Sequence, residues 1–260
     1  MTASKHGTFV WYEMLATDTT AAKDFYTRLI GWTTQEWDEM GQPYTMWVAG
    51  EKPFAGLMEL PEEARSAGAP PHWLAYVSVD DVDQTTAKAV ELGATVLVPA
   101  QDIPKIGRFS VIADPQGAVI SPFKSFEASS DASDEMAMLQ FSWHELSSSD
   151  LETSWTFYSK LFGWKVLDDM DMGDAGLYRI YGLEGKPPLG GMYKKPAEFP
   201  GPPAWLFYVM VEDVSALVDQ VTSLGGTVLT GPMKVPGGGS ILMCLDSQGA
   251  AFALHSEGKS

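Results

Sequence analysis

Residues 11–32 read WYEMLATDTTAAKDFYTRLIGW and residues 143–164 read WHELSSSDLETSWTFYSKLFGW, so one pattern occurs twice at a spacing of 132 residues. The same spacing relates later pairs: Pro70-Pro71 and Pro202-Pro203, Trp73-Leu74 and Trp205-Leu206, and Gln116-Gly117 and Gln248-Gly249. A spacing kept from the start of each half to its end indicates duplicated domains of equal size. We expect features that both halves share to be architectural, and features that differ to carry the chemistry.

The chain of 260 residues is long enough for two domains of ordinary size. We predict a first domain over residues 6–127, a linker over 128–138 and a second domain over 139–257. The linker contains the run ASSDASD at residues 128–134, which is small, polar and without apolar periodicity.

Composition narrows the class of partner. A formal net charge of −17 disfavours nucleic acids and anionic membranes and favours neutral or cationic small molecules. No run of 18 apolar residues and no secretory signal is visible, so we predict a cytoplasmic protein without a membrane span. The single cysteine, Cys244, agrees with a reducing compartment, and its apolar surroundings predict a buried, inert thiol.

Strand and helix signals follow the same order in both halves. The first half opens with a strand over 8–15 and a helix from Asp18 to the stop at Gly31, followed by strands over 32–37, 44–49 and 54–60. A second set has a strand over 73–79, a helix over 82–92 and strands over 95–98, 109–113 and 118–123. The second half matches it, with helices over 151–162 and 214–224. The sequence therefore predicts an α+β fold of four βαβββ modules.

Three motifs give the chain its resemblance to a known family. They are a helix with an acidic start that ends Phe-Tyr, a basic residue and Gly-Trp, a Val-x-Val-Asp/Glu-Asp-Val strand end, and an Asp-Pro/Ser-Gln-Gly turn. In this order, found twice, they resemble the vicinal oxygen chelate superfamily of glyoxalase I, extradiol dioxygenases, fosfomycin-resistance enzymes and bleomycin-binding proteins. The resemblance implies two tandem domains, each of two βαβββ modules, in a monomer or homodimer.

The resemblance also implies where a metal would be held. The ligand positions of metal-bearing relatives fall on Trp11, Leu74 and Ser121 in the first half, and on Trp143, Leu206 and Ala253 in the second. Indole and alkyl groups do not bind divalent cations. We therefore expect no standard metal site and no cofactor, with an unorthodox divalent site formed by Glu13, Glu59 and His72 as the alternative.

Strand alternation places Trp11 and Glu13 on one face, and Trp143 and Glu145 on the corresponding face. A carboxyl group beside an indole in an apolar cavity acquires a raised pKa, which makes Glu13 and Glu145 candidate catalytic bases. The alternative is that each glutamate forms a hydrogen bond with a backbone or tyrosine group and so closes the module interface.

Residues that differ between the halves are candidate ligand contacts. His72 and Arg108 correspond to Ala204 and Ser240, and His144 corresponds to Tyr12. We predict a ligand-binding set of Trp11, His72, Arg108, Trp143 and His144, and Trp47 as a further stacking candidate. For His72, the alternative is a solvated residue after the Pro-Pro loop.

The leading hypothesis is a glyoxalase-like protein that binds a small organic molecule in an aromatic cavity without the standard metal. A second hypothesis is a lyase, isomerase or hydroxylase-like enzyme that uses Glu13 as base or the unorthodox metal. A third is an assembly partner whose cavities are filled.

Overall fold

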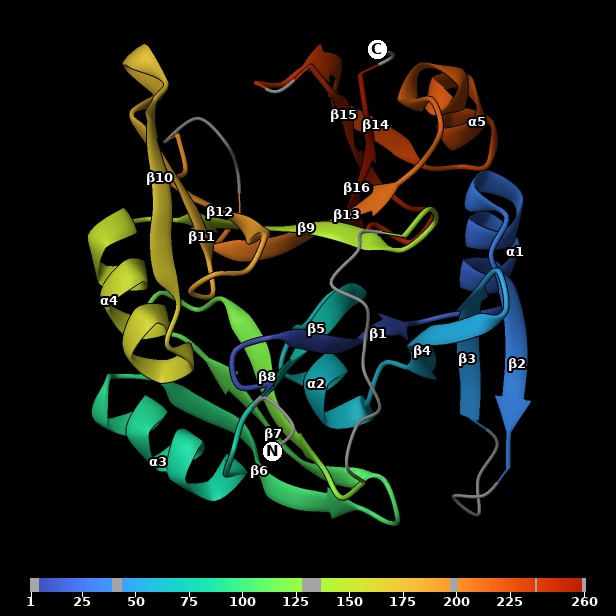
Figure 1. The fold of residues 1–260 in the computed structure, drawn as a ribbon. Helices are drawn as coiled ribbons and strands as arrows, with labels where there is room; N and C mark the ends of the chain where they lie inside the picture. The colour runs from blue at the N-terminus through green and yellow to red at the C-terminus, as the bar shows by residue number, and fades with distance from the viewer. Residues whose placement is uncertain (1–4, 39–43, 128–136, 197–200, 237, 259–260) are drawn as a thin grey trace. The chain divides into compact units, whose positions relative to one another are not determined.

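The computed structural model describes residues 5–38, 44–127, 137–196, 201–236 and 238–258. The fold is α+β and consists of four βαβββ modules, as the sequence predicts (Figure 1). Nine of the eleven residues predicted as linker over 128–138, namely 128–136, lie outside the described residues.

The first half holds two modules joined by a short helix. The first comprises β1 (Phe9–Ala16), α1 (Thr19–Ile30), β2 (Thr33–Trp37), β3 (Tyr44–Ala49) and β4 (Lys52–Glu59). The helix α2 (Glu62–Ser66), which the sequence did not predict, follows. The second comprises β5 (His72–Ser78), α3 (Val82–Glu91), β6 (Thr95–Ile103), β7 (Gly107–Ala113) and β8 (Val119–Ser125).

The second half repeats this order with two short 3-10 helices added. Its first module comprises β9 (Phe141–Ser148), α4 (Leu151–Phe162), β10 (Lys165–Asp171), η1 (Gly173–Ala175), β11 (Leu177–Gly182) and β12 (Pro188–Lys194). Its second comprises β13 (Ala204–Met210), η2 (Val214–Leu217), α5 (Val218–Ser223), β14 (Thr227–Lys234), β15 (Ser240–Leu245) and β16 (Ala251–Ser256). The helix predicted over 214–224 is therefore split between η2 and α5.

Every module has the same strand order, which is β1-β4-β3-β2 in the first. The first and last strands, β1 and β4, run parallel, and the other neighbours run antiparallel. A parallel pair needs a long crossover, and the helix after the first strand provides it. The last strand of each module therefore lies beside the first, so in the first module of each half its residues meet those of β1 or β9.

The helix ends follow the expected capping chemistry. The Asp18 carboxylate accepts a hydrogen bond from the Ala21 backbone N–H at 2.9 Å and begins α1. Gly31 ends α1 in the left-handed conformation at φ 86°, where a side chain would be strained. Asp150 and Gly163 perform the same two roles for α4. The predicted bounds of α4 are confirmed.

Contacts between Cα atoms divide the chain into two compact units that each draw on both halves. One unit comprises residues 1–10, 75–135 and 143–205, and the other comprises 11–74, 136–142 and 206–260. In the first of these, α3 of the first half and α4 of the second half lie side by side (Figure 1). The compact units and the sequence halves thus divide the chain differently.

The glutamine of the Asp-Pro/Ser-Gln-Gly turn joins the two halves within each unit. Gln248 accepts a hydrogen bond from the Asp18 backbone N–H at 2.7 Å and donates to the Asp18 carbonyl at 2.9 Å. Gln116 makes the matching pair of bonds to Asp150, at 2.7 and 2.9 Å. Since Asp18 and Asp150 cap α1 and α4, each turn fixes the helix start of the opposite half.

A buried aromatic cluster forms the core beneath α1. Trp73 Nε1 donates to the Tyr26 hydroxyl at 2.9 Å, and that hydroxyl donates to Asp246 Oδ2 at 3.1 Å. The Trp32 and Trp47 rings pack at 5.5 Å, and both side chains have 0% exposure. Trp32 and Trp73 therefore belong to the core, whereas the suggestion that Trp47 stacks on a ligand is wrong, because Trp47 is enclosed.

Cys244 is fully buried, and burial raises the pKa of its thiol to about 12, which confirms the predicted inert cysteine.

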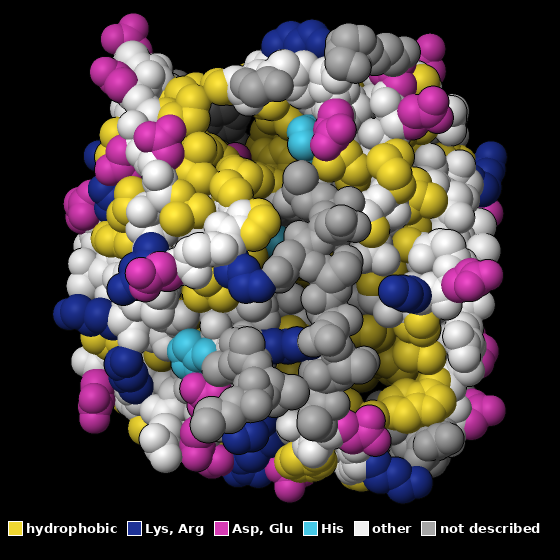
Figure 2. Space-filling model, viewed as in Figure 1, with side chains coloured by type: hydrophobic (Ala, Val, Ile, Leu, Met, Phe, Trp, Pro, Cys, Tyr) yellow, Lys and Arg dark blue, Asp and Glu magenta, His cyan; other side chains and the backbone are white. Residues whose placement is uncertain are grey.

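On the face that Figure 2 shows, Lys and Arg side chains lie dispersed among Asp and Glu side chains. In the described parts of the chain, no helix is long and apolar enough to cross a membrane.

Candidate functional site

Three polar side chains of the first module form a hydrogen-bonded chain, here named the first cluster. Trp11 Nε1 donates to the Tyr44 hydroxyl at 3.1 Å, and the Tyr44 hydroxyl donates to Glu13 Oε2 at 2.8 Å. Trp11 and Glu13 lie on β1 and Tyr44 begins β3. Trp11 is half-buried whereas Glu13 is only 4% exposed, so the cluster leads from an accessible indole to an enclosed carboxyl group.

The second half contains the same arrangement, the second cluster. Trp143 Nε1 donates to the Tyr178 hydroxyl at 2.9 Å, and this hydroxyl donates to Glu145 Oε2 at 2.8 Å. Trp143 is half-buried and Glu145 is buried. The predicted pairs Trp11 with Glu13 and Trp143 with Glu145 are therefore each brought together, with a tyrosine between them.

A glycine on the intervening strand makes each cluster possible. Gly56 of β4 pairs with Glu13 of β1, and β4 lies between β1 and β3. A Cβ at residue 56 would collide with the Tyr44 hydroxyl and Glu13 Oε1. Gly191 pairs with Glu145 in the same way, and a Cβ there would collide with the Tyr178 ring. The missing side chain lets each tyrosine reach across a strand to its glutamate.

The electrostatics of Glu13 favour its protonated form. Burial raises the pKa of the Glu13 carboxyl to about 8 from the usual 4.5, although Tyr44 and Trp11 act to lower it. Oε2 accepts the Tyr44 proton, whereas Oε1 has no hydrogen-bond partner among the described residues. The group can thus hold a proton at neutral pH on an oxygen that makes no bond.

His144 lies away from the second cluster. Its ring stacks on Phe9 with centroids 3.7 Å apart and planes at 4°, and its Nδ1 lies 2.6 Å from the Leu189 carbonyl oxygen. Burial lowers the pKa of His144 to about 4, so the ring is neutral. Its neighbours Trp143 and Glu145 point to the other face of β9, as strand alternation requires.

His72 and Arg108 have local partners. His72 is half-buried, and its Nδ1 lies 2.8 Å from the Pro70 carbonyl oxygen. Arg108 binds both carboxylate oxygens of Asp83, at 2.7 and 2.9 Å, and Asp102 at 2.6 Å. A bidentate pair of this kind connects the start of α3 to the β6–β7 hairpin.

Comparison with known proteins places the chain in a family. The model of the Glyoxalase/Bleomycin resistance protein/Dioxygenase superfamily matches residues 8–121 and again residues 140–254. The chain belongs to this superfamily. The two matches fall on the two sequence halves, which confirms both the resemblance and the tandem fold.

Known relatives match this chain over nearly its whole length. A Mycobacterium tuberculosis protein named "Putative glyoxylase CFP32" is 32% identical over 257 residues, covering 96% of this chain and 95% of that protein. The anthracycline biosynthesis protein DauV of Streptomyces sp. (strain C5) is 27% identical over 265 residues, covering 98% of this chain and 94% of its own. The Mn(II)-bound glyoxalase of Novosphingobium aromaticivorans has a similar fold, with a TM-score of 0.65, 16% identity, and coverage of 99% of this chain and 84% of that one.

The side chains at the superfamily's metal positions do not fit a divalent cation. Trp11 uses its only polar atom to donate to Tyr44, and Ser121 donates to the Ser110 carbonyl oxygen at 2.7 Å. Leu74, Leu206 and Ala253 have no donor atom in their side chains. Among the described residues no group of three or more His, Cys, Asp or Glu could hold a metal, so the alternative set of Glu13, Glu59 and His72 is not assembled.

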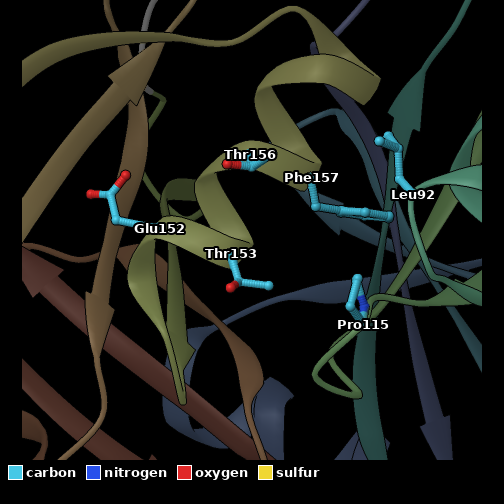
Figure 3. A pocket seen from close by; sticks show the side chains of 6 residues that line it. All are labelled: Leu92, Pro115, Glu152, Thr153, Thr156 and Phe157. Atoms are coloured by element: carbon cyan, nitrogen blue, oxygen red, sulfur yellow. The ribbon is translucent and has the colours of Figure 1, made fainter.

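A shallow depression of about 340 Å³ lies on the unit that contains α3 and α4. Figure 3 shows Phe157 of α4 directed toward Leu92 and Pro115, with Thr153 and Glu152 on the neighbouring turn. This depression contains none of the predicted site residues. Its lining is mostly apolar and threonine side chains, which provide few groups for catalysis.

Sequence reasoning missed Tyr44 and Tyr178. A signal for them was present: each is the first or second residue of the strand that precedes a Gly-containing strand, β4 with Gly56 or β12 with Gly191. The signal was hidden because the segment between the Gly-Trp pair and the tyrosine is two residues longer in the second half. The two tyrosines therefore depart from the spacing of 132 residues that relates Glu13 to Glu145.

Proposed function

We propose that this superfamily member binds a small, uncharged organic molecule against the indoles of its Trp-Tyr-Glu clusters, and that it does so without the metal ligands of its relatives. The observation that carries this proposal is the repeated cluster itself. In each cluster, hydrogen bonds lead from a half-buried indole through a tyrosine hydroxyl to a buried carboxyl group. An indole offers a flat apolar face, and a buried polar group gives orientation.

Two further observations support it. The donor atoms at the superfamily's ligand positions do not suit a divalent cation, so recognition falls to side chains. The relative DauV is named an anthracycline biosynthesis protein, which supports an organic small molecule as the ligand class. A net charge of −17 opposes anionic ligands.

The test uses fluorene, a flat hydrocarbon, as the probe and quenching of tryptophan fluorescence as the signal. Loss of the indole in Trp11→Ala should weaken binding about threefold to tenfold, since a stacked aromatic contact contributes about 0.5–1.5 kcal/mol. Trp155→Ala is the matched control, because Trp155 lies on α4 outside both clusters and packs under Arg179. Equal weakening in both variants would contradict the proposal.

Metal content is the companion measurement. We expect elemental analysis of the purified protein to find no stoichiometric Mn, Fe, Ni or Zn, and a chelator to leave fluorene binding unchanged. One metal ion per chain, lost together with binding, would refute a metal-free site.

A second candidate function is proton transfer by Glu13 in an isomerase or lyase reaction. The raised pKa of about 8 favours it, because a group that titrates near neutral pH can both take up and return a proton. Deuterium exchange at the carbon beside the carbonyl of 1-indanone, followed by NMR, tests this role. Glu13→Gln should stop enzyme-dependent exchange, and unchanged exchange would eliminate Glu13 as the base.

A further inference from the structure

The two clusters share their hydrogen bonds but differ in a side chain beside the glutamate. Gly56 is followed two residues later by Met58, and Gly191 is followed two residues later by Tyr193. Residues two apart on a strand share a face, so Met58 and Tyr193 each lie on the face that carries the cluster glutamate. The halves therefore present different side chains beside otherwise equal clusters.

In the second half, this position supplies a phenol. The Tyr193 ring stacks on the Tyr178 ring with centroids 6.0 Å apart and planes at 20°. Burial, and then the charge of Glu145, raise the pKa of Tyr193 to about 12. Tyr193 is thus close enough to Glu145 for the two groups to interact electrostatically.

In the first half, this position supplies no polar hydrogen atom. Met58 is 43% exposed, and its thioether cannot donate a hydrogen bond. Glu13 Oε1 has no partner among the described residues, although Glu13 is 4% exposed. A buried polar atom without a partner is unusual in a folded protein, and a ligand beside the half-buried Trp11 would supply the partner that Oε1 lacks.

We infer that the first cluster is the ligand site, and that Glu13 Oε1 donates a hydrogen bond to the carbonyl oxygen of a flat, neutral ligand seated beside Trp11. This rests on the proposed function and adds to it the half of the chain that binds and the ligand's chemical class. Because Oε2 already accepts the Tyr44 hydroxyl, the proton of the neutral carboxyl group lies on Oε1, which makes that atom a donor. A hydrogen-bond donor in an enclosed site selects an acceptor, and a ketone oxygen is a neutral acceptor that lies in the plane of a flat ring system.

Met58 provides the route to the carboxyl group. Its side chain is unbranched and exposed, so it can move aside at little cost. Tyr193 in the second half is half-buried and stacked, so it stays in place. The second cluster then serves the architecture of its half, and the ligand binds at the first cluster.

The experiment compares 9-fluorenone with fluorene, which has the same flat ring system without the carbonyl group. The wild-type chain should bind 9-fluorenone about tenfold to a hundredfold more tightly than fluorene, the gain expected from satisfying a buried donor. Glu13→Met, which keeps the chain length without a donor, should reduce this ratio to about one. Glu145→Met is the matched control and should keep the ratio within twofold of the wild type.

The exchange of the two differing residues avoids any substitution inside the clusters. Met58→Tyr places the second half's phenol beside Glu13 at an exposed position, and it should abolish the preference for 9-fluorenone. Tyr193→Met should leave it unchanged. Thermal unfolding of each variant confirms that the fold is intact.

The outcomes separate the inference from the proposed function. Equal binding of both compounds to the wild type, or loss of the preference in Glu145→Met but not in Glu13→Met, would overturn the inference while small-molecule binding stands. Failure of both compounds to bind would overturn both. Infrared spectroscopy adds a measurement without ligand: a carboxylic acid C=O band at pH 7 that disappears in Glu13→Gln is expected, and its absence in the wild type would also overturn the inference.

Discussion

Replacing Glu13 by glutamine should remove a pH dependence from the free energy of unfolding. Burial raises the pKa of Glu13 to about 8 in the folded protein, whereas the unfolded chain has the usual value of 4.5. Between these values the folded state binds the proton more tightly than the unfolded state. Stability from this group is therefore fully present below pH 4.5, and it is lost as the pH rises toward 8.

The magnitude follows from the size of the shift. Each unit of pKa difference corresponds to about 1.4 kcal/mol, so Glu13 reduces the free energy of unfolding by about 3 kcal/mol between pH 5 and pH 7.5. Glutamine keeps the acceptor for the Tyr44 hydroxyl but cannot titrate. Its buried amide adds a cost that is the same at every pH.

Urea unfolding of the wild type and Glu13→Gln at half-unit steps from pH 5 to pH 8 measures the effect. The difference between the two free energies should change by about 3 kcal/mol in favour of the variant as the pH rises. Glu59→Gln is the control, because Glu59 is an exposed glutamate at the end of β4. Parallel curves for the wild type and Glu13→Gln would refute the claim that Glu13 is held protonated.

Two other predictions concern the framework. Gly56→Ala should lower the free energy of unfolding by about 1–3 kcal/mol and weaken binding at the first cluster, because its Cβ collides with the Tyr44 hydroxyl and Glu13 Oε1. Urea unfolding measures the loss, and a change below about 0.5 kcal/mol would contradict the steric argument. Gln248→Ala should lower the free energy of unfolding by about 1–3 kcal/mol, because it leaves the Asp18 backbone N–H and carbonyl groups without their partners. Calorimetry should show a lower melting temperature. A loss below about 0.5 kcal/mol, which is usual for surface substitutions, would show that the glutamine does not join the halves.

The sequence by itself determined the local structure and the family. The repeated spacing defined the duplication, and Asp18 and Gly31 fixed the ends of α1, because capping depends on residues adjacent in the chain. Strand alternation was sufficient to place Trp11 with Glu13 on one face of β1. Alternation also placed residue 144 on the opposite face, where His144 is found stacked on Phe9.

Tertiary structure decided what each of these side chains meets. Tyr44 reaches Glu13 only because β4 brings Gly56 between their strands, and no pattern within β1 specifies that neighbour. Arg108 is held by Asp83, which belongs to another element. Glu13 acquires its raised pKa from enclosure, which depends on many residues distant in the chain. The partners of a side chain across strands, its burial and the electric field around it all depend on residues from many parts of the chain. They therefore exist only after the chain has folded.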